Sequence, residues 1–307
     1  MTASNAATKS IDGVLVVDKP VGPSSHDVVA VARRSLGISR IGHTGTLDPQ
    51  ASGVLPLVVG QATRLAQYLS GSDKEYEAII RFGVVTDTQD ATGDVIGESD
   101  VAPPRGDIEA AMRQFTGTFD QTPPLYSAKM VDGERSYVRA RAGKPMQAAA
   151  VSVTVHVLEL LAYEAPRARV RVRCSAGFYV RSLAHELGAA VGVGAMLDGL
   201  VRTEAAGFRP DDAMAFATLV GAPRAELCTR IRPMEVLLAD IPSTALTEEG
   251  LQWALQGRDL GPHQLVAPPA ALPPLVRLIG PDGRLAGLAD VAKTPGFLHP
   301  AVVFKYN

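Results

Sequence analysis

The stretch GHTGTLDPQASG, residues 42–53, decides how the rest of the chain is interpreted. It has neither helical nor strand periodicity and is rich in glycine, threonine and proline, so it predicts a shaped loop between two regular elements. Pro49 favours an extended backbone at Asp48, while Gly42 and Gly45 permit turns that other residues avoid. We therefore expect the Asp48 carboxylate to project from a fixed bend. The alternative is a turn aspartate that only caps a neighbouring amide.

Regular elements are expected on both sides of this loop. Residues 13–17 predict a buried strand that the Lys19-Pro20 step stops. Ser24 with Asp27 three residues later is a capping-box pattern, so a helix should begin there and end at Gly37. Periodicity further predicts strands at residues 54–59, 75–82, 151–161 and 168–174, and helices at residues 62–69, 108–115 and 179–191. This order predicts an α+β domain with a mainly antiparallel mixed sheet flanked by helices.

The strands at residues 151–161 and 168–174 are the clearest and are expected to pair. Around the second, every other residue is an arginine, at positions 167, 169, 171 and 173, whereas Val170 and Val172 lie on the opposite face. One face should therefore be buried and the other strongly basic. We interpret the basic face as a solvated surface rather than as an RNA contact.

A second unit is expected to begin near the Ile241-Pro242 step. Residues 246–255 predict a helix capped by Thr247 and ended by Gly257, and residues 275–279, 285–289 and 301–304 predict short strands between proline and glycine turns. The expected domains are a disordered segment at residues 1–12, a main domain at residues 13–238 and a small β-barrel at residues 239–307.

Composition limits the class of protein. The chain has 307 residues, 46% of them hydrophobic, as in ordinary globular proteins. Its 30 basic and 32 acidic residues give a net charge of −2, so any RNA site must be a local patch. Cys174 and Cys228 form no CxxC pair, which argues against a metal site. The start of the chain lacks the apolar core of a signal peptide and no stretch suits a membrane span, so a cytoplasmic protein is expected.

The motif loop and its surroundings resemble TruB-type pseudouridine synthases. The family pattern is GHxGTLDPxAxGxLP followed by GxATK or GxATR, and this chain carries GHTGTLDPQASGVLP at residues 42–56 and GQATR at residues 60–64. Four further segments agree in order: residues 18–22 with Ser25; Lys74 and Tyr76 with residues 87–90; residues 123–128; and residues 174–181. The resemblance spans residues 13–207, and it implies a pseudouridine synthase fold with a tail like the PUA module of many members.

The resemblance implies an activity, the isomerisation of uridine to pseudouridine at position 55 in the T loop of tRNA. The reaction breaks the N-glycosidic bond, rotates the uracil and rejoins it through C5 without net redox change, so it requires a nucleophile but neither cofactor nor metal. Asp48 would be the nucleophile and Arg181 the cation that keeps it charged. Tyr76 would stack on the flipped base and take part in proton transfer. Judged by local sequence alone, Tyr76 fits a core tyrosine and Arg181 an exposed helix arginine.

The resemblance also implies residues that bind the substrate. His43 would contact the gap left by the flipped base, Tyr179 would flank the pocket, and Asp90 would order polar contacts there. RNA affinity should come mainly from phosphate contacts and from the shape of the T arm. The side chains expected to supply the phosphate contacts are Lys19, Arg64, Lys74, Lys129 and Arg202.

The sequence departs from the family pattern at four positions. Ala176, Met130 and Val201 stand where members usually carry a basic residue, and Phe178 stands where threonine is usual. Two alternatives remain: a guide-dependent synthase of the H/ACA type, and a noncatalytic module that binds or folds tRNA. We expect no guide RNA, because the segment before Gly13 is short and the tail lacks the basic extension common in guided relatives. We also expect a monomer.

Overall fold

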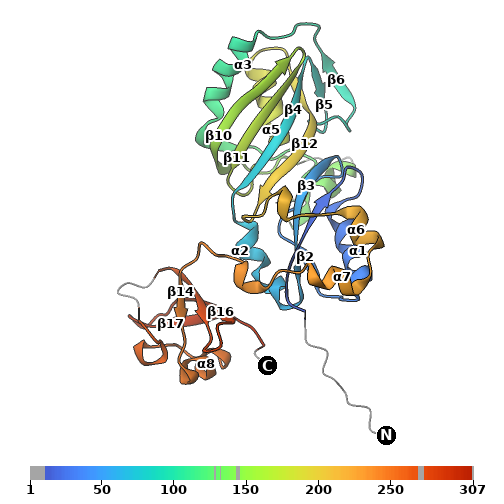
Figure 1. Ribbon diagram of the computed structural model, residues 1–307. Coiled ribbons are helices and arrows are strands. Elements are labelled where there is room, and N and C mark those ends of the chain that lie inside the picture. The colour runs from blue at the N-terminus through green and yellow to red at the C-terminus, as the bar shows by residue number, and fades with distance from the viewer. Residues whose placement is uncertain (1–10, 128, 132, 143–145, 269–272, 306–307) are drawn as a thin grey trace.

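The main part of the molecule is a nine-stranded mixed sheet in the order β13-β1-β3-β12-β4-β11-β10-β7, with β2 paired to β3 (Figure 1). The structure is a computed structural model that describes residues 11–305 apart from 128, 132, 143–145 and 269–272. Most pairs in this sheet are antiparallel, and only β1 with β13 and β3 with β12 run parallel in the described part. The strands are β1 (Gly13–Lys19), β2 (Ile41–His43), β3 (Ala51–Val59), β4 (Lys74–Phe82), β7 (Gly117–Gln121), β10 (Val151–Glu164), β11 (Arg167–Cys174), β12 (Ala195–Ala205) and β13 (Met214–Ala215). The expected fold class is confirmed.

Helices cover this sheet in two groups. In Figure 1, α3 (Arg105–Met112) and α5 (Val180–Ala190) lie against β4, β10, β11 and β12, and their apolar side chains share one core with those strands. Helices α1 (Ser25–Leu36), α6 (Phe216–Gly221) and α7 (Arg224–Thr229) pack on β1 and β3 around a second core. Shorter elements complete the domain: η1 (Gly60–Leu65), α2 (Ala66–Ser70), β5 (Val84–Thr86), β6 (Val95–Glu98), η2 (Arg113–Phe115), β8 (Met130–Val131), β9 (Glu134–Arg135), α4 (Ser136–Arg141), η3 (Pro210–Asp212) and η4 (Met234–Val236).

The start of α1 follows the sequence pattern. The Ser24 side chain accepts a hydrogen bond from the Asp27 amide, and the Asp27 carboxylate accepts one from the Ser24 amide at 2.8 Å. Gly37 ends the helix with φ 63°, a conformation that costs glycine little. The capping-box prediction is confirmed, and the fixed helix start brings Ser25 against the motif loop.

The central strand β12 was not expected from the sequence. It pairs parallel with β3 and antiparallel with β4, so it joins the two halves of the sheet. Its register sets Arg202 opposite Tyr76 on one side and opposite Gly53 on the other. A Cβ on Gly53 would lie 2.3 Å from the backbone oxygen of Arg202, and its φ is 103°, so glycine is required for this close pairing.

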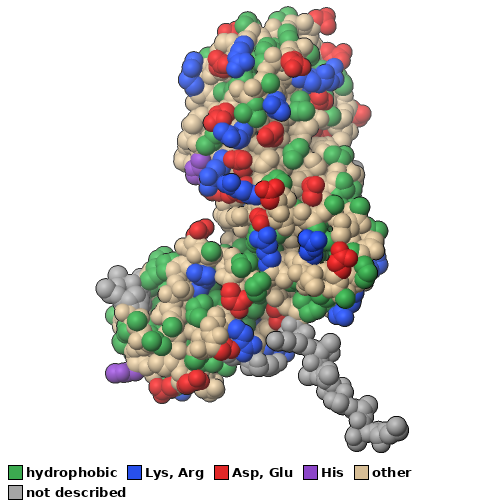
Figure 2. Space-filling model, viewed as in Figure 1, with side chains coloured by type: hydrophobic (Ala, Val, Ile, Leu, Met, Phe, Trp, Pro, Cys, Tyr) green, Lys and Arg blue, Asp and Glu red, His purple; other side chains and the backbone are tan. Residues whose placement is uncertain are grey.

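Strands β10 and β11 pair as predicted, and the two faces of β11 differ as predicted. Val170 and Val172 are fully buried. On the other face Arg167, Arg171 and Arg173 form ion pairs with Asp198, Glu159 and Asp73. Figure 2 shows the same mixture on the visible face of the molecule, where Lys and Arg are interspersed with Asp and Glu. The arginine ladder is therefore largely compensated by carboxylates.

The C-terminal part forms a small sheet in the order β14-β15-β16-β17 with its own apolar cluster. Its elements are β14 (Ser243–Ala245), α8 (Glu248–Leu255), η5 (Pro262–Gln264), β15 (Leu275–Ile279), β16 (Leu285–Val291) and β17 (Leu298–Val303). Thr247 caps α8 as expected, by accepting a hydrogen bond from the Gly250 amide. Leu288 and Phe304 also share a core cluster with Val14 and Leu65, so the tail packs firmly on the main domain.

The expected disordered segment, residues 1–12, lies outside the described residues up to position 10. Asp12 is described, and its carboxylate accepts hydrogen bonds from the backbone amide and side-chain amide of Gln61. The boundary expected between residues 238 and 239 stays a prediction. Among the described residues, no helix is long and apolar enough to cross a membrane.

Candidate active site

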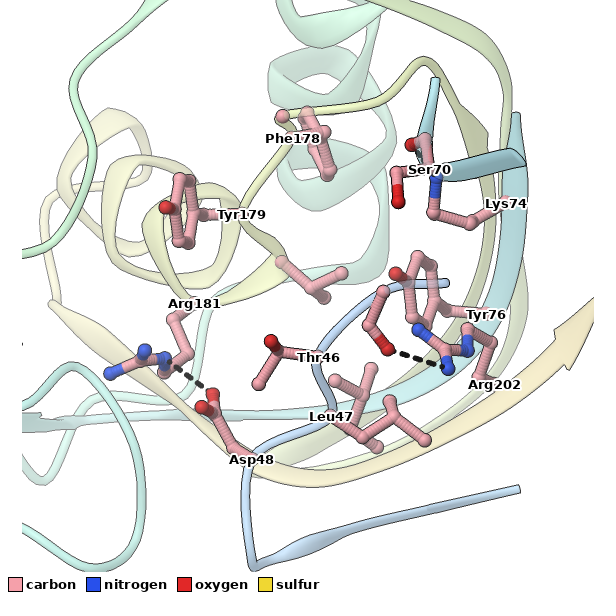
Figure 3. Close-up of a pocket in the computed structure, with 14 residues that line it drawn as sticks. Thr46, Leu47, Asp48, Ser70, Lys74, Tyr76, Phe178, Tyr179, Arg181 and Arg202 are labelled. Atoms are coloured by element: carbon pink, nitrogen blue, oxygen red, sulfur yellow. Dashed lines mark hydrogen bonds and ion pairs between the residues drawn. The ribbon is translucent and has the colours of Figure 1, made fainter. Parts of the chain in front are cut away.

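The motif loop forms one wall of a cavity of about 260 Å³. The other walls are the ends of β4 and β12 and the segment that leads into α5, so segments far apart in sequence meet there (Figure 3). The lining residues are Gly45, Thr46, Leu47, Asp48, Ser70, Lys74, Tyr76, Gly177, Phe178, Tyr179, Val180, Arg181, Leu200 and Arg202. Among the lining residues that the structure describes, Asp48 is the only carboxylate, against three basic side chains.

Two buried side chains hold the loop in place. Lys19 is fully buried, and its Nζ donates to the carbonyl oxygens of Pro20 at 2.9 Å, Pro49 at 3.4 Å and Ala51 at 2.6 Å. Ser25 Oγ donates to the Leu47 carbonyl and accepts from the Leu47 amide at 2.8 Å. Asp48 therefore lies between clamped neighbours, and the expected fixed bend has a physical cause.

Asp48 and Arg181 form the ion pair that the family resemblance implies. Arg181 Nε lies 3.1 Å from Asp48 Oδ2, although the two residues are far apart in sequence. The arginine side chain is 8% exposed and the aspartate side chain 39% exposed, so the carboxylate is accessible from the cavity and the guanidinium lies behind it. This arrangement holds the carboxylate beside a cation and leaves it open to the cavity.

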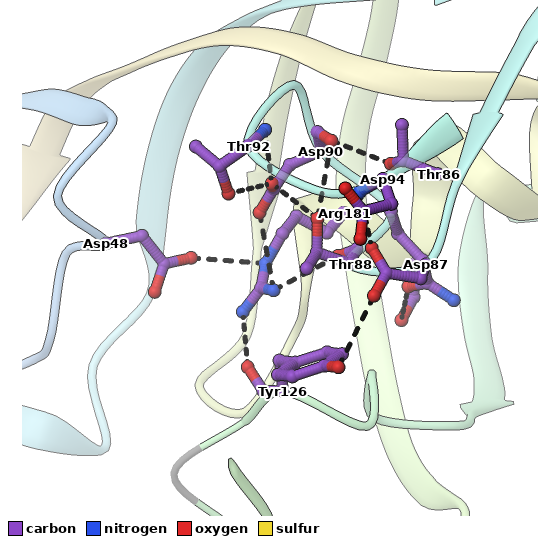
Figure 4. A network of polar contacts seen from close by, with 11 residues as sticks. Asp48, Thr86, Asp87, Thr88, Asp90, Thr92, Asp94, Tyr126 and Arg181 are labelled. Carbon is purple, nitrogen blue, oxygen red and sulfur yellow. Dashed lines mark hydrogen bonds and ion pairs between the residues drawn. The ribbon is translucent and has the colours of Figure 1, made fainter. Parts of the chain in front are cut away.

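The other two nitrogens of the Arg181 guanidinium also have partners (Figure 4). The guanidinium lies 3.4 Å from Asp90 Oδ2 and donates to the carbonyl oxygens of Thr88 and Tyr126 at 3.2 and 3.0 Å. Burial favours the neutral form of Asp90, but hydrogen bonds from Thr92 and Thr88 hold its pKa below the ordinary value. Asp90 is therefore a buried anion that orients Arg181, as its expected ordering role requires.

Backbone contacts fix the start of α5. The buried side chain of Gln121 donates to the Tyr179 carbonyl at 3.1 Å and accepts from the Tyr179 amide at 2.8 Å. Ser182 Oγ donates to the Thr122 carbonyl at 2.9 Å. The Tyr179 ring thus stands at the cavity wall next to Arg181 (Figure 3), and burial raises the pKa of its hydroxyl.

Tyr76 lies at the floor of the cavity. It is 8% exposed, and burial raises the pKa of its hydroxyl, while the charge of the neighbouring Arg202 opposes that rise. Burial also lowers the pKa of Lys74 to about 8, with the charge of Arg202 acting in the same direction. Lys74 Nζ donates to the carbonyl oxygens of Ser70 at 2.8 Å and Ser72 at 2.6 Å. The floor therefore combines an aromatic ring with cationic groups.

His43 does not line the cavity. It lies at the end of β2, and its ring packs edge-to-face with that of His26 at a centroid distance of 5.2 Å. Burial, with smaller effects of His26 and Arg202, lowers the pKa of His43 to about 4. The ring is therefore neutral at physiological pH, which suits contact with a base better than contact with a phosphate.

Two of the expected phosphate contacts need correction. Lys19 and Arg202 are 0% and 1% exposed, and backbone carbonyls occupy their polar groups, so neither can reach an RNA phosphate at the surface. Arg64 is exposed but donates to the Val303 carbonyl of the tail. Lys74 faces the cavity instead of the outer surface. Lys129 is exposed and stays a candidate for phosphate contact.

Sequence reasoning missed several lining residues. Leu200 lies in the unexpected strand β12, so its position beside the cavity could not be inferred. Phe178 lines the cavity at a position noted only as a departure from the family pattern, and Thr46 was quoted only as part of the motif. A strand predicted for residues 195–205 would have drawn attention to Leu200 and to the burial of Arg202.

The chain is similar to known pseudouridine synthases. Residues 33–180 match the model of the TruB family pseudouridylate synthase N-terminal domain. The tRNA pseudouridine synthase B of Azoarcus sp. strain BH72 is 43% identical over 250 residues, which cover 81% of this chain and 83% of that protein. The protein of the same name from Burkholderia pseudomallei strain 668 is 41% identical over 295 residues, which cover 96% of this chain and 97% of that protein.

Two solved structures are also similar. One is a chain of an H/ACA RNP bound to a substrate RNA containing 2′-deoxyuridine, with a TM-score of 0.74 and 26% identity over 96% of this chain and 85% of that chain. The other is from a Cbf5-Nop10-Gar1 complex, with a TM-score of 0.73 and 29% identity over 95% of this chain and 84% of that chain. Fold, cavity and relatives together define the class of the protein, a pseudouridine synthase and hence an isomerase. Within that class, the chain belongs to the TruB family of pseudouridylate synthases.

Proposed function

We propose that this protein converts uridine 55 in the T loop of tRNA into pseudouridine, as a monomer, with Asp48 as nucleophile and without a guide RNA. The observation that carries the proposal is the accessible Asp48 carboxylate, held 3.1 Å from a buried arginine at a cavity with a tyrosine in its floor. The relatives named tRNA pseudouridine synthase B supply the substrate class.

The cavity suits a nucleoside that has left its base stack. A base inside a folded loop cannot reach a recessed carboxylate, so it must flip out at a cost of a few kcal/mol. Tyr76, Tyr179 and Phe178 offer aromatic faces against which the uracil can stack.

The chemistry needs only groups that the chain provides. Attack by the Asp48 carboxylate, on the uracil ring or on C1′, lets the C1′–N1 bond break and keeps the fragment bound while the uracil turns. A C1′–C5 bond then forms, the proton on C5 is removed, and N1 gains a proton, so atoms and electrons balance. The Tyr76 hydroxyl is the group placed to take part in that proton transfer.

A second candidate function is guided modification, because similar folds occur in H/ACA assemblies. The proposal favours the unguided reaction, since the relatives named tRNA pseudouridine synthase B are 41–44% identical and the chains from H/ACA assemblies 26–29% identical.

Incubation of the purified protein alone with unmodified tRNA tests the proposal. Pseudouridine mapped at position 55 of the T loop, and at no other uridine, is the expected result. Product only after a guide RNA is added would replace the proposal by the second candidate. Tight tRNA binding with no product under either condition would leave only a noncatalytic binding module.

A further inference from the structure

Arg202 is a buried cation that the proposed chemistry does not use. Its side chain lies within the main domain, at 1% exposure, with the guanidinium turned toward the cavity floor (Figure 3). Within the described residues, no carboxylate oxygen comes within the 4.0 Å limit for an ion pair with it. Burial of an arginine without a carboxylate partner destabilises the folded protein. The groups that Arg202 does contact should therefore explain why an arginine occupies this position.

Those contacts join three separate parts of the site. Arg202 Nε donates to the Val54 carbonyl of β3 at 2.8 Å, and NH2 donates to the Gly45 carbonyl of the Asp48 loop at 3.2 Å. The guanidinium also lies beside the Tyr76 side chain in the cavity floor. The β4–β12 register places Tyr76 directly opposite Arg202, so this last contact follows from strand pairing.

We infer that Arg202 is a positioning residue: it lies opposite Tyr76 in the β4–β12 register and its guanidinium holds the Asp48 loop at Gly45, so that nucleophile and proton-transfer group keep one fixed separation. This inference rests on the proposed function, which gives Asp48 and Tyr76 their roles in the reaction. A flat guanidinium with several donors can hold two carbonyls of separate segments at once, whereas a lysine ammonium is a compact charge on a flexible stem. The arrangement therefore requires arginine rather than a cation in general.

Electrostatics supports the same role. Burial makes ionisation of the Tyr76 hydroxyl unfavourable, and the adjacent guanidinium offsets part of that cost. In return, Tyr76 is the group that stabilises the charged form of Arg202 against burial. Each of the two residues thus compensates for the burial of the other.

The test uses Arg202→Lys and Arg202→Met, with Arg209→Met as the matched control, because Arg209 is 71% exposed and ion-paired with Glu204 outside the cavity. Three quantities are measured for each full-length variant: the tRNA dissociation constant, the single-turnover rate constant, and the ¹³Cζ NMR signal of Tyr76. A Tyr76→Phe sample identifies that signal among the seven tyrosines. Arg202→Lys keeps the positive charge, so it is expected to fold even if Arg202→Met does not.

Arg202→Lys should lower the single-turnover rate about 10²-fold with little change in tRNA affinity, since a small misplacement of reacting groups has an effect of that size. Its Tyr76 signal should shift, that of Arg202→Met should shift further, and Arg209→Met should match the wild type in all three quantities. A wild-type rate or an unshifted Tyr76 signal in Arg202→Lys would overturn the inference. If the wild type itself formed no pseudouridine, the proposed function would fail, while the NMR signal would still decide whether Arg202 holds Tyr76.

Discussion

The Arg181 guanidinium forms ion pairs with two carboxylates that differ in exposure: its Nε lies 3.1 Å from Asp48 Oδ2 and its NH1 lies 3.4 Å from Asp90 Oδ2. The side chain of Asp48 is 39% exposed and that of Asp90 4% exposed. Asp90 is surrounded by hydrogen-bond donors, whereas Asp48 faces the cavity. We therefore expect the two acids to have different tasks, one to anchor the arginine and the other to meet the substrate.

Replacing Asp90 by asparagine tests the anchoring task. Asp90→Asn keeps the size of the side chain but removes the charge that orients Arg181, so the single-turnover rate should fall about tenfold while tRNA affinity stays the same. Asp94→Asn, an exposed residue of the same hairpin, is the control and should have the wild-type rate. A wild-type rate for Asp90→Asn would mean that Asp48 and the backbone carbonyls orient Arg181 without it.

Removing one hydroxyl separates stacking from proton transfer at Tyr76. Tyr76→Phe should bind tRNA normally, because the ring remains, but should slow the steps after glycosidic cleavage by about 10²–10⁴-fold. Quenched time courses that resolve intermediate from product provide the measurement. Tyr163→Phe loses a hydroxyl bonded to the Pro103 carbonyl away from the cavity and should keep the wild-type rate. Full activity in Tyr76→Phe would exclude the hydroxyl from the mechanism.

His43 should make stability depend on pH. Its pKa is lowered from 6.5 to about 4, so between these values the unfolded chain binds a proton that the folded protein does not. This contribution to stability is complete above pH 6.5 and is lost as the pH falls through about 4, a change of roughly 1–3 kcal/mol. Urea unfolding at several pH values should show a smaller dependence for His43→Gln than for the wild type. The exposed His263→Gln is the control, and an unchanged slope in His43→Gln would contradict the prediction.

Two lysines expected to bind RNA should behave differently. Lys19→Met removes the donor shared by three loop carbonyls and should lower the free energy of unfolding by about 1–3 kcal/mol. Lys129→Met, at an exposed position, should leave stability unchanged and reduce the salt dependence of tRNA binding by about one phosphate contact. Unfolding curves and binding at several salt concentrations measure both effects. If Lys19→Met instead left stability unchanged and reduced the salt dependence of tRNA binding, Lys19 would again be a candidate RNA ligand.

Local patterns in the sequence predicted local structure well. The capping box at Ser24 and the alternation in β11 each depend on neighbouring residues, and both occur as expected. Strand β12 was missed because its pairing with β3 and β4 is a long-range property. The helix expected at residues 62–69 is instead η1 followed by α2, and the short helix α3 already begins at Arg105, after Pro104.

The candidate site was predictable only in part, because the burial of a side chain, like the pairing of β12, depends on long-range contacts. The motif pointed to Asp48, and the family resemblance brought in Tyr76 and Arg181, all three of which line one cavity. Burial could not be inferred, so Lys19 and Arg202 were taken for surface cations. A basic residue in a sequence indicates charge, but only the fold shows whether that charge reaches solvent or holds a loop.

The most direct test of the account is turnover by Asp48→Asn on unmodified tRNA, measured together with tRNA affinity. Asparagine has nearly the same size and can still accept a hydrogen bond from Arg181, so binding should change little while pseudouridine formation should vanish. Asp120→Asn, an exposed aspartate of β7, serves as the control and should turn over normally. Repeated turnover by Asp48→Asn would contradict the account, because it would show that the reaction does not depend on this carboxylate.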